Sequence, residues 1–112
     1  MMLTTGFISQ PVEQNEYYFK EGCFILESHN DPRDPEVSIA RARVETNTST
    51  RKHALNGTTE RYVILSGQGK VTLDDSATQV MAGSVVVIPA GVSQSIKNTG
   101  SDDLVFLAIC SP

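Results

Sequence analysis

The sequence predicts an all-β sandwich or barrel with little or no helix. Its 112 residues are enough for one core and too few for two, so we expect a single domain over residues 1–112. Short runs rich in Val, Ile, Phe and Tyr recur with turn residues between them, and no long helical period appears. About eight to ten such runs at regular spacing are typical of an all-β sandwich or barrel.

The first predicted strands flank a proline-rich loop. Residues 1–20 are polar at their start and are expected to form an N-terminal arm or strand, and residues 23–28 form the first clear apolar run. Pro32 and Pro35 mark the following stretch as a loop. Residues 37–45 then alternate in character with a period of two, which predicts a strand.

The middle of the chain predicts a hairpin. Residues 61–66 and 70–73 form two apolar runs, and the glycines of 67–69 supply a tight turn between them. A short strand is expected at 79–82. Residues 52–56 are the one helical possibility, and Gly57 ends that segment too soon for a stable helix.

The last third of the chain predicts core strands. Residues 84–89 are apolar and largely β-branched, which indicates a strand buried in the core. Another strand is expected at 93–97, and residues 104–110 close the chain as a fully apolar strand.

Composition narrows the possible partners. The net charge of −4 and the pI near 5.0 argue against nucleic-acid binding, which needs a basic surface. A membrane span needs roughly 18 consecutive apolar residues, and no run approaches that length. No secretory signal is visible at the N-terminus. Cys23 and Cys110 lie in apolar stretches and fit no metal spacing, so we expect reduced thiols in a cytoplasmic protein.

The stretch KHALNGTTERYVILSGQG places polar groups beside a strand. Because strand side chains alternate, Glu60, Tyr62 and Ile64 share one face, and an inward Glu60 must be paired, hydrogen-bonded or bound to a metal. The turn at Asn56-Gly57 lets His53 approach that face. The glycines of SGQG lack the third glycine, the helix and the Lys-Ser/Thr pair of a phosphate loop.

Two stretches together resemble the paired motifs of the cupin superfamily. The first cupin motif has two histidines, a glutamate and a glycine, and this chain has His53, Leu55, Glu60 and Gly67 at the matching positions. The second motif runs glycine, proline, glycine, histidine and asparagine. The matching residues of this chain are Gly83, Pro89, Gly91, Gln94 and Asn98.

The resemblance covers residues 53–98 and implies a double-stranded β-helix, the cupin jelly-roll barrel, with a small-molecule pocket inside. Leu55 and Gln94 stand where this pattern usually has histidine, so the motif is degenerate.

The resemblance also implies a divalent metal held by three histidines and the glutamate. In this chain His53, Glu60 and Gln94 remain as candidate metal ligands, while Leu55 cannot ligate. Such a donor set favours Mn or Fe(II), with Ni or Zn possible. A metal-dependent enzyme of oxygenase, isomerase or cyclase type, acting on a small polar or carboxylated metabolite, is the leading functional prediction. Whether the protein is an enzyme stays open.

Two alternatives stand beside the metal enzyme. The chain could be a metal-free binding module for a sugar-like or carboxylated ligand, with the motif residues forming a hydrogen-bonded cluster. It could also be a structural or regulatory protein with a vestigial pocket. Small cupins often form homodimers through sheet edges or an exchanged N-terminal strand, so a homodimer is expected.

The remaining candidates are pocket-lining residues: Leu55, Tyr62, Ile64, Ile96, Arg41 and Arg43. The two arginines share a strand face with Ile39, opposite Ala40, Ala42 and Val44. On the pocket side they would bind a carboxylate or phosphate. The competing interpretation, which charge favours, directs them to solvent or to a partner chain.

Overall fold

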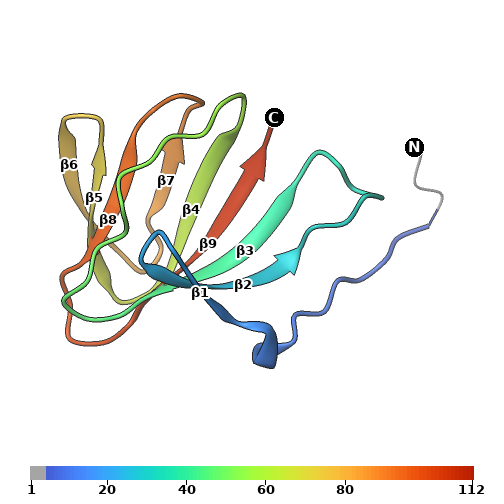
Figure 1. Cartoon of the computed structure of the whole chain (residues 1–112), viewed down its shortest axis with the longest axis horizontal. Helices are drawn as coiled ribbons and strands as arrows, with labels where there is room; N and C mark the ends of the chain where they lie inside the picture. The colour runs from blue at the N-terminus through green and yellow to red at the C-terminus, as the bar shows by residue number, and fades with distance from the viewer. Residues whose placement is uncertain (1–4) are drawn as a thin grey trace.

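A computed structural model of the protein describes residues 5–112. These residues form a six-stranded sheet, a three-stranded sheet and one 3-10 helix, which confirms the predicted all-β fold. Figure 1 shows the smaller sheet at one end and the N-terminal segment reaching away at the other. The elements in chain order are η1 (Glu13–Asn15), β1 (Tyr17–Phe19), β2 (Cys23–His29), β3 (Ser38–Val44), β4 (Thr59–Ser66), β5 (Gln68–Leu73), β6 (Ser76–Met81), β7 (Val85–Ile88), β8 (Gln94–Asn98) and β9 (Leu104–Ser111).

Both sheets are antiparallel, and segments far apart in sequence lie next to each other. The larger sheet has the order β1-β2-β3-β9-β4-β7, and the smaller has the order β6-β5-β8. Beyond β8, the segment 48–53 runs alongside through isolated bridges that pair Ser49 with Lys97 and His53 with Gln94. The path of this segment explains why 52–56 forms no helix: its backbone hydrogen bonds go to β8.

Two elements, β6 and β7, differ from the sequence prediction. Within the predicted N-terminal arm or strand, Tyr17–Phe19 pairs with β2 of its own chain in a short hairpin. β7 was expected to be buried, but only Val86 and Ile88 are buried, while Val85 and Val87 are 60% and 52% exposed. The β6 strand begins at Ser76, earlier than the predicted 79–82, because its polar residues pair with the whole of β5. For β6, pairing with β5 outweighs the weak strand propensity of its first residues.

The turn between β4 and β5 requires glycine. Gly67 has φ +87°, and a Cβ atom at this position would lie 2.6 Å from the carbonyl oxygen of Asp103. This close approach brings the start of β9 against the β4–β5 turn.

The core lies between the two sheets. Alternation along each strand directs one set of side chains inward, and the most deeply buried are aliphatic. They include Val44, Ile64, Ile88, Ile96 and Leu104, each at most 2% exposed.

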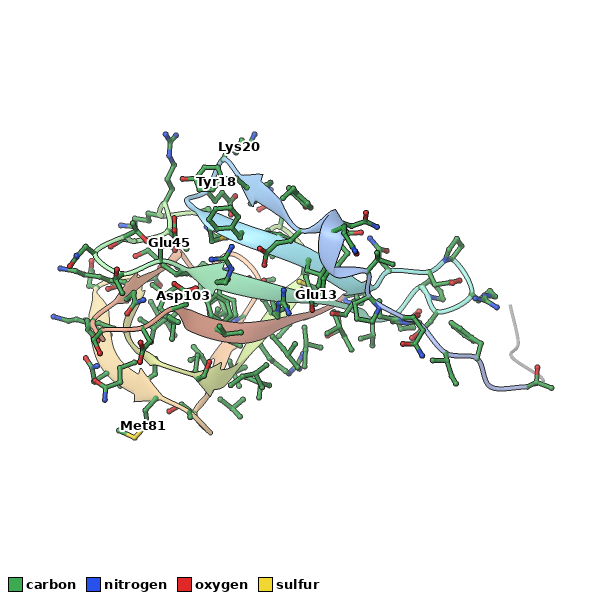
Figure 2. All side chains as sticks on the ribbon, turned by 90° about the horizontal axis from the view of Figure 1, so that it is seen from below. Glu13, Tyr18, Lys20, Glu45, Met81 and Asp103 are labelled. Carbon is green, nitrogen blue, oxygen red and sulfur yellow. The ribbon has the colours of Figure 1, made fainter. Side chains whose placement is uncertain are left out.

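The opposite face of the large sheet carries an ion-pair cluster. Arg41 contacts Glu13 at 2.8 Å and Glu16 at 3.1 Å, while Arg43 contacts Glu16 at 2.7 Å and Asp103 at 3.1 Å. Figure 2 shows Glu13 and Asp103 toward opposite ends of β3. The cluster ties the segment around η1 to the outside of the sheet.

No helix among residues 5–112 is long and apolar enough to cross a membrane.

Candidate functional site

A cavity of about 270 Å³ lies on the inner face of the large sheet. Its walls come from β1 to β4, from β9, and from the 50–55 segment beside β8. Most of the lining is apolar or aromatic, with a few polar groups. The lining residues are Tyr17, Phe19, Glu21, Cys23, Ile25, Ser38, Ala40, Ala42, Thr50, His53, Leu55, Glu60, Tyr62, Phe106, Ala108 and Cys110.

Three buried polar side chains form a chain of hydrogen bonds at the inner wall. Gln94 on β8 donates from Nε2 to Oε1 of Glu60 on β4, with 2.6 Å between the atoms. The Tyr62 hydroxyl donates to Oε1 of the same glutamine. Glu60, Tyr62 and Gln94 are 8%, 4% and 1% exposed. The Gln94 amide thus bridges the carboxylate and the phenol.

The alternation of β4 explains two of these positions. Glu60 and Tyr62 are two residues apart and project from the same face, as the sequence predicts. Burial raises the pKa of the Tyr62 hydroxyl well above its ordinary value, and the nearby Glu60 charge adds to the shift. Tyr62 therefore remains a neutral hydrogen-bond donor at neutral pH.

The two thiols belong to the same cavity, which sequence reasoning missed. Cys110 pairs with Glu60 across β4 and β9, and its Sγ lies 3.6 Å from Glu60 Oε2. Burial first, and then the Glu60 charge, raises the pKa of Cys110 to about 11. Burial, with the charges of Glu21 and Glu60, raises the pKa of Cys23 to about 11. Both thiols are free and protonated at neutral pH, so neither is an activated nucleophile.

His53 reaches the cavity, but its ring faces a different carboxylate from the one expected. Its backbone exchanges two hydrogen bonds with Gln94, which fixes its place beside β8. Nδ1 lies 2.9 Å from the carbonyl oxygen of Arg51, and Nε2 lies 3.3 Å from Glu21 Oε2. Glu21 comes from the β1–β2 turn, and its backbone accepts from Arg51. No sequence pattern links position 21 to position 53, so this contact could not be foreseen.

The arrangement does not fit the predicted metal site. Gln94 directs its amide N–H toward Glu60, although a metal ligand would present its oxygen, and that oxygen already accepts from Tyr62. The His53 ring is turned to Glu21. In the part of the chain that the structure describes, no three His, Cys, Asp or Glu side chains come together as a group that could hold a metal ion.

The other predicted pocket residues divide into two groups. Leu55 and Tyr62 line the cavity. Ile64 and Ile96 instead pack within the core, each 1% exposed. Arg41 and Arg43 also need correction, because alternation along β3 places Ala40 and Ala42 on the cavity side and the arginines on the other face. Burial of an unpaired guanidinium would be costly, and the acidic residues around η1 supply partners outside.

The fold and the cavity on its inner face define a small antiparallel β-barrel with space for a ligand. The sequence model of the Cupin domain family matches residues 40–110, and the protein belongs to this family. KdgF from Halomonas sp. aligns with a TM-score of 0.82 at 14% identity, over 96% of this chain and 94% of that one. This similarity confirms the predicted jelly-roll fold.

Sequence relatives extend over most of the chain. An uncharacterized protein of Methanocaldococcus jannaschii is 32% identical over 114 residues, covering 99% of this chain and 91% of the relative. The oxalate-binding protein of Thermotoga maritima is 37% identical over 71 residues, covering 63% of this chain and 59% of its own length. The crystal structure of a predicted oxalate decarboxylase from the same organism has a TM-score of 0.74 at 27% identity, with 92% of both chains covered.

Proposed function

We propose that this cupin binds a small molecule in the cavity between its sheets and does so without a resident metal. The hydrogen-bonded bridge from Glu60 through Gln94 to Tyr62 carries this proposal. The bridge uses Glu60 and Gln94, two of the three candidate metal ligands, and it leaves the aromatic and aliphatic walls of the cavity free to contact a ligand.

The names of two related proteins support the proposal that the ligand is a small molecule. One is named for oxalate binding, and a structural neighbour is titled a predicted oxalate decarboxylase. From these relatives we infer for this chain only that a small molecule binds in the barrel. The residues that line the cavity decide which ligand it is, and they belong to this chain alone. A cytoplasmic location remains part of the proposal, and it is consistent with the two free thiols.

The metal-dependent enzyme predicted from the sequence requires other side-chain orientations of Gln94 and His53. The Gln94 amide would have to turn its oxygen toward a metal held beside Glu60, and the His53 ring would have to leave Glu21. Both hypotheses use the same cavity, so metal analysis separates them, as set out in the Discussion.

A cavity-filling variant tests binding directly. Ala40 lines the cavity from β3, so Ala40→Leu narrows it, whereas Ala77→Leu adds the same atoms to the exposed surface of β6. Small-molecule fragments are screened by methyl NMR. We expect hits to shift signals of Ile25, Leu55 and Ala108, and to be lost in A40L only. Hits that persist in A40L, or that shift only outer-face methyls, would contradict the proposal.

We further propose that the protein forms a homodimer through the outer face of β9, β4 and β7. Alternation places aliphatic side chains on this face, and Leu65, Val85 and Val87 are 47%, 60% and 52% exposed. The aliphatic side chains of this face, which extends to β3, are Ile39, Val63, Leu65, Val85, Val87, Val105, Leu107 and Ile109, and Arg61 lies among them between Val87 and Ile109.

The outer face of the small sheet has a different character. Lys70 on β5 lies between Gln79 and Lys97 in the register, and all three are exposed. A solvent-facing antiparallel sheet is expected to be polar in this way. A largely aliphatic face is suited to a protein partner, and a second copy presents a matching surface through a two-fold contact.

A further inference from the structure

We infer that the cavity selects a small organic cation, such as a protonated amine, over a carboxylate. The inference rests on the proposed function and specifies the class of ligand that the metal-free cavity takes.

The charged side chains that line the cavity are mainly acidic. Glu21 and Glu60 both line it, and among the described residues no lysine or arginine does. His53 is the one lining side chain able to carry positive charge. A bound anion would therefore face two carboxylates, while a bound cation would be attracted by both.

The two arginines considered for the pocket from the sequence are held elsewhere. Arg41 and Arg43 lie on the opposite face of β3 and are engaged by Glu13, Glu16 and Asp103. They cannot approach the cavity, because alternation along the strand fixes them on the outside. Among the described residues, no arginine lines the cavity to bind a carboxylate ligand through two parallel hydrogen bonds.

Both carboxylate oxygens of Glu60 act as hydrogen-bond acceptors. Oε1 accepts from Gln94, and Oε2 is contacted by the Cys110 thiol, a weak donor. The bridging amide thus presents Glu60 as a hydrogen-bond acceptor beside the cavity, which suits a ligand with N–H donors.

A second pair of acceptors lies at the more exposed side. The carbonyl oxygen of Arg51 can only accept, so Nδ1 of His53 carries the hydrogen in that contact. In the neutral tautomer, Nε2 is then an acceptor 3.3 Å from Glu21 Oε2. A ligand donor placed there would serve both atoms. The side chains of His53 and Glu21 are 21% and 27% exposed, so solvent reaches this pair.

Aromatic walls favour the same class of ligand. Tyr17, Phe19, Tyr62 and Phe106 all line the cavity, and the rings of Tyr62 and Phe106 lie 4.3 Å apart between centroids. The faces of aromatic rings attract cations, and their bulk shields the apolar part of a ligand from water.

The surface next to the cavity also carries acidic side chains. A more open hollow of about 500 Å³ shares Ser38 and Cys110 with the cavity. Acidic Asp31, Asp34 and Glu36 contribute to it, although Asp31 is paired with Arg33 and Asp34 with His29. The hollow that adjoins the cavity is therefore acidic to neutral.

The experiment compares three probes of one shape: benzylammonium, benzyl alcohol and benzoate. Binding to metal-free, chelator-treated protein is measured at pH 7.5 by calorimetry and by shifts of cavity methyl signals. We expect benzylammonium to bind at least about tenfold more tightly than benzoate, with benzyl alcohol between them. Oxalate is tested in parallel, with and without Mn²⁺, and we expect no binding in either condition.

Two variants assign the preference to the cavity carboxylates. Glu21→Gln and Glu60→Gln each keep the side-chain shape and should reduce the preference for benzylammonium by several-fold. Glu45→Gln, on an exposed residue outside the cavity, is the matched control and should leave the preference unchanged. Because Glu60→Gln perturbs a buried bridge, its melting temperature is measured first, and Glu21→Gln serves alone if E60Q unfolds.

The outcomes are distinguishable. Benzoate binding as tightly as benzylammonium, or a preference that survives both carboxylate variants, overturns the inference and leaves the proposed function intact. Absence of cavity shifts with all three probes overturns both. Oxalate that binds only when Mn²⁺ is present overturns the metal-free function and supports the metal hypothesis.

Discussion

Gln94 Nε2 lies 2.6 Å from Glu60 Oε1, although 34 residues separate the two side chains in sequence. Both are buried, and the same amide accepts from the Tyr62 hydroxyl. An amide has both a donor and an acceptor, so it can satisfy a carboxylate and a phenol at once. A position that usually holds a metal-binding histidine in this motif therefore serves here as a hydrogen-bond bridge.

Loss of this bridge should destabilise the protein. We expect Gln94→Ala to lower the free energy of unfolding by about 2–4 kcal/mol, because it leaves Glu60 and Tyr62 without their partner and opens a void. Urea denaturation measures the change. Gln79→Ala is the control, since Gln79 is exposed and its side chain donates to the Thr99 hydroxyl at the surface, and its effect should stay below about 1 kcal/mol. Equal effects of the two changes would show that the bridge contributes nothing.

Metal content separates the two functional hypotheses. Protein purified without chelator should carry no more metal than a Glu60→Ala and Gln94→Ala double variant. Added Mn, Fe(II), Ni or Zn should not raise its melting temperature. Restoring the motif with Leu55→His and Gln94→His should increase metal uptake, because imidazole is a better ligand than leucine or an amide. Stoichiometric metal in the wild-type protein, by elemental analysis, would refute the metal-free proposal.

The buried thiols predict a stability that falls in alkali. The folded protein holds the protons of Cys23 and Cys110 more tightly than the unfolded chain, since their pKa is raised from 9.0 to about 11. Their contribution is complete below about pH 9 and is lost as the pH rises through about 11. Urea titrations from pH 7 to 11 should show this decline, and a Cys23→Ala and Cys110→Ala variant should show less of it. An unchanged slope in the variant would assign the decline to other groups.

The ion pairs outside the sheet predict the opposite pH dependence. Hydrogen bonds from Arg41 and Arg43 hold the pKa of Glu13 and Glu16 below the ordinary value. These ion pairs stabilise the protein above that value and lose their effect as the pH falls through the lowered pKa. Arg43→Ala removes the contacts with Glu16 and Asp103, and the contact with Glu16 helps to hold the segment around η1 to the sheet. It should therefore speed hydrogen exchange in β1, which follows this segment and pairs with β2, without changing benzylammonium affinity. A loss of affinity would instead connect this face to the cavity.

The aliphatic outer face predicts a dimer that charge disrupts. Sedimentation velocity should find a dimer at micromolar concentration, and Val85→Lys with Val87→Lys should shift it to a monomer, because the lysines place charge on the apolar contact. Ala77→Lys, on the exposed surface of β6, is the control and should remain dimeric. A monomeric wild type would remove the dimer from the proposal.

The sequence by itself determined the fold and the shared face of Glu60 and Tyr62. Strand side chains alternate with a period of two, so an apolar pattern fixes which residues face the core without knowledge of the neighbours. The same rule, applied to β3, put Arg41 and Arg43 on one face, and their charge favoured the outward interpretation over their assignment to the pocket.

Only the tertiary structure decided what the polar groups contact. The β1–β2 turn brings Glu21 to His53, strand pairing brings Cys110 to Glu60, and the crossing of β8 brings the Gln94 amide between Glu60 and Tyr62. These contacts join residues 32 to 50 positions apart, and each depends on strand register and side-chain rotamer together. Local periodicity carries no information about either across such distances, so the charge of the cavity became visible only in the folded barrel.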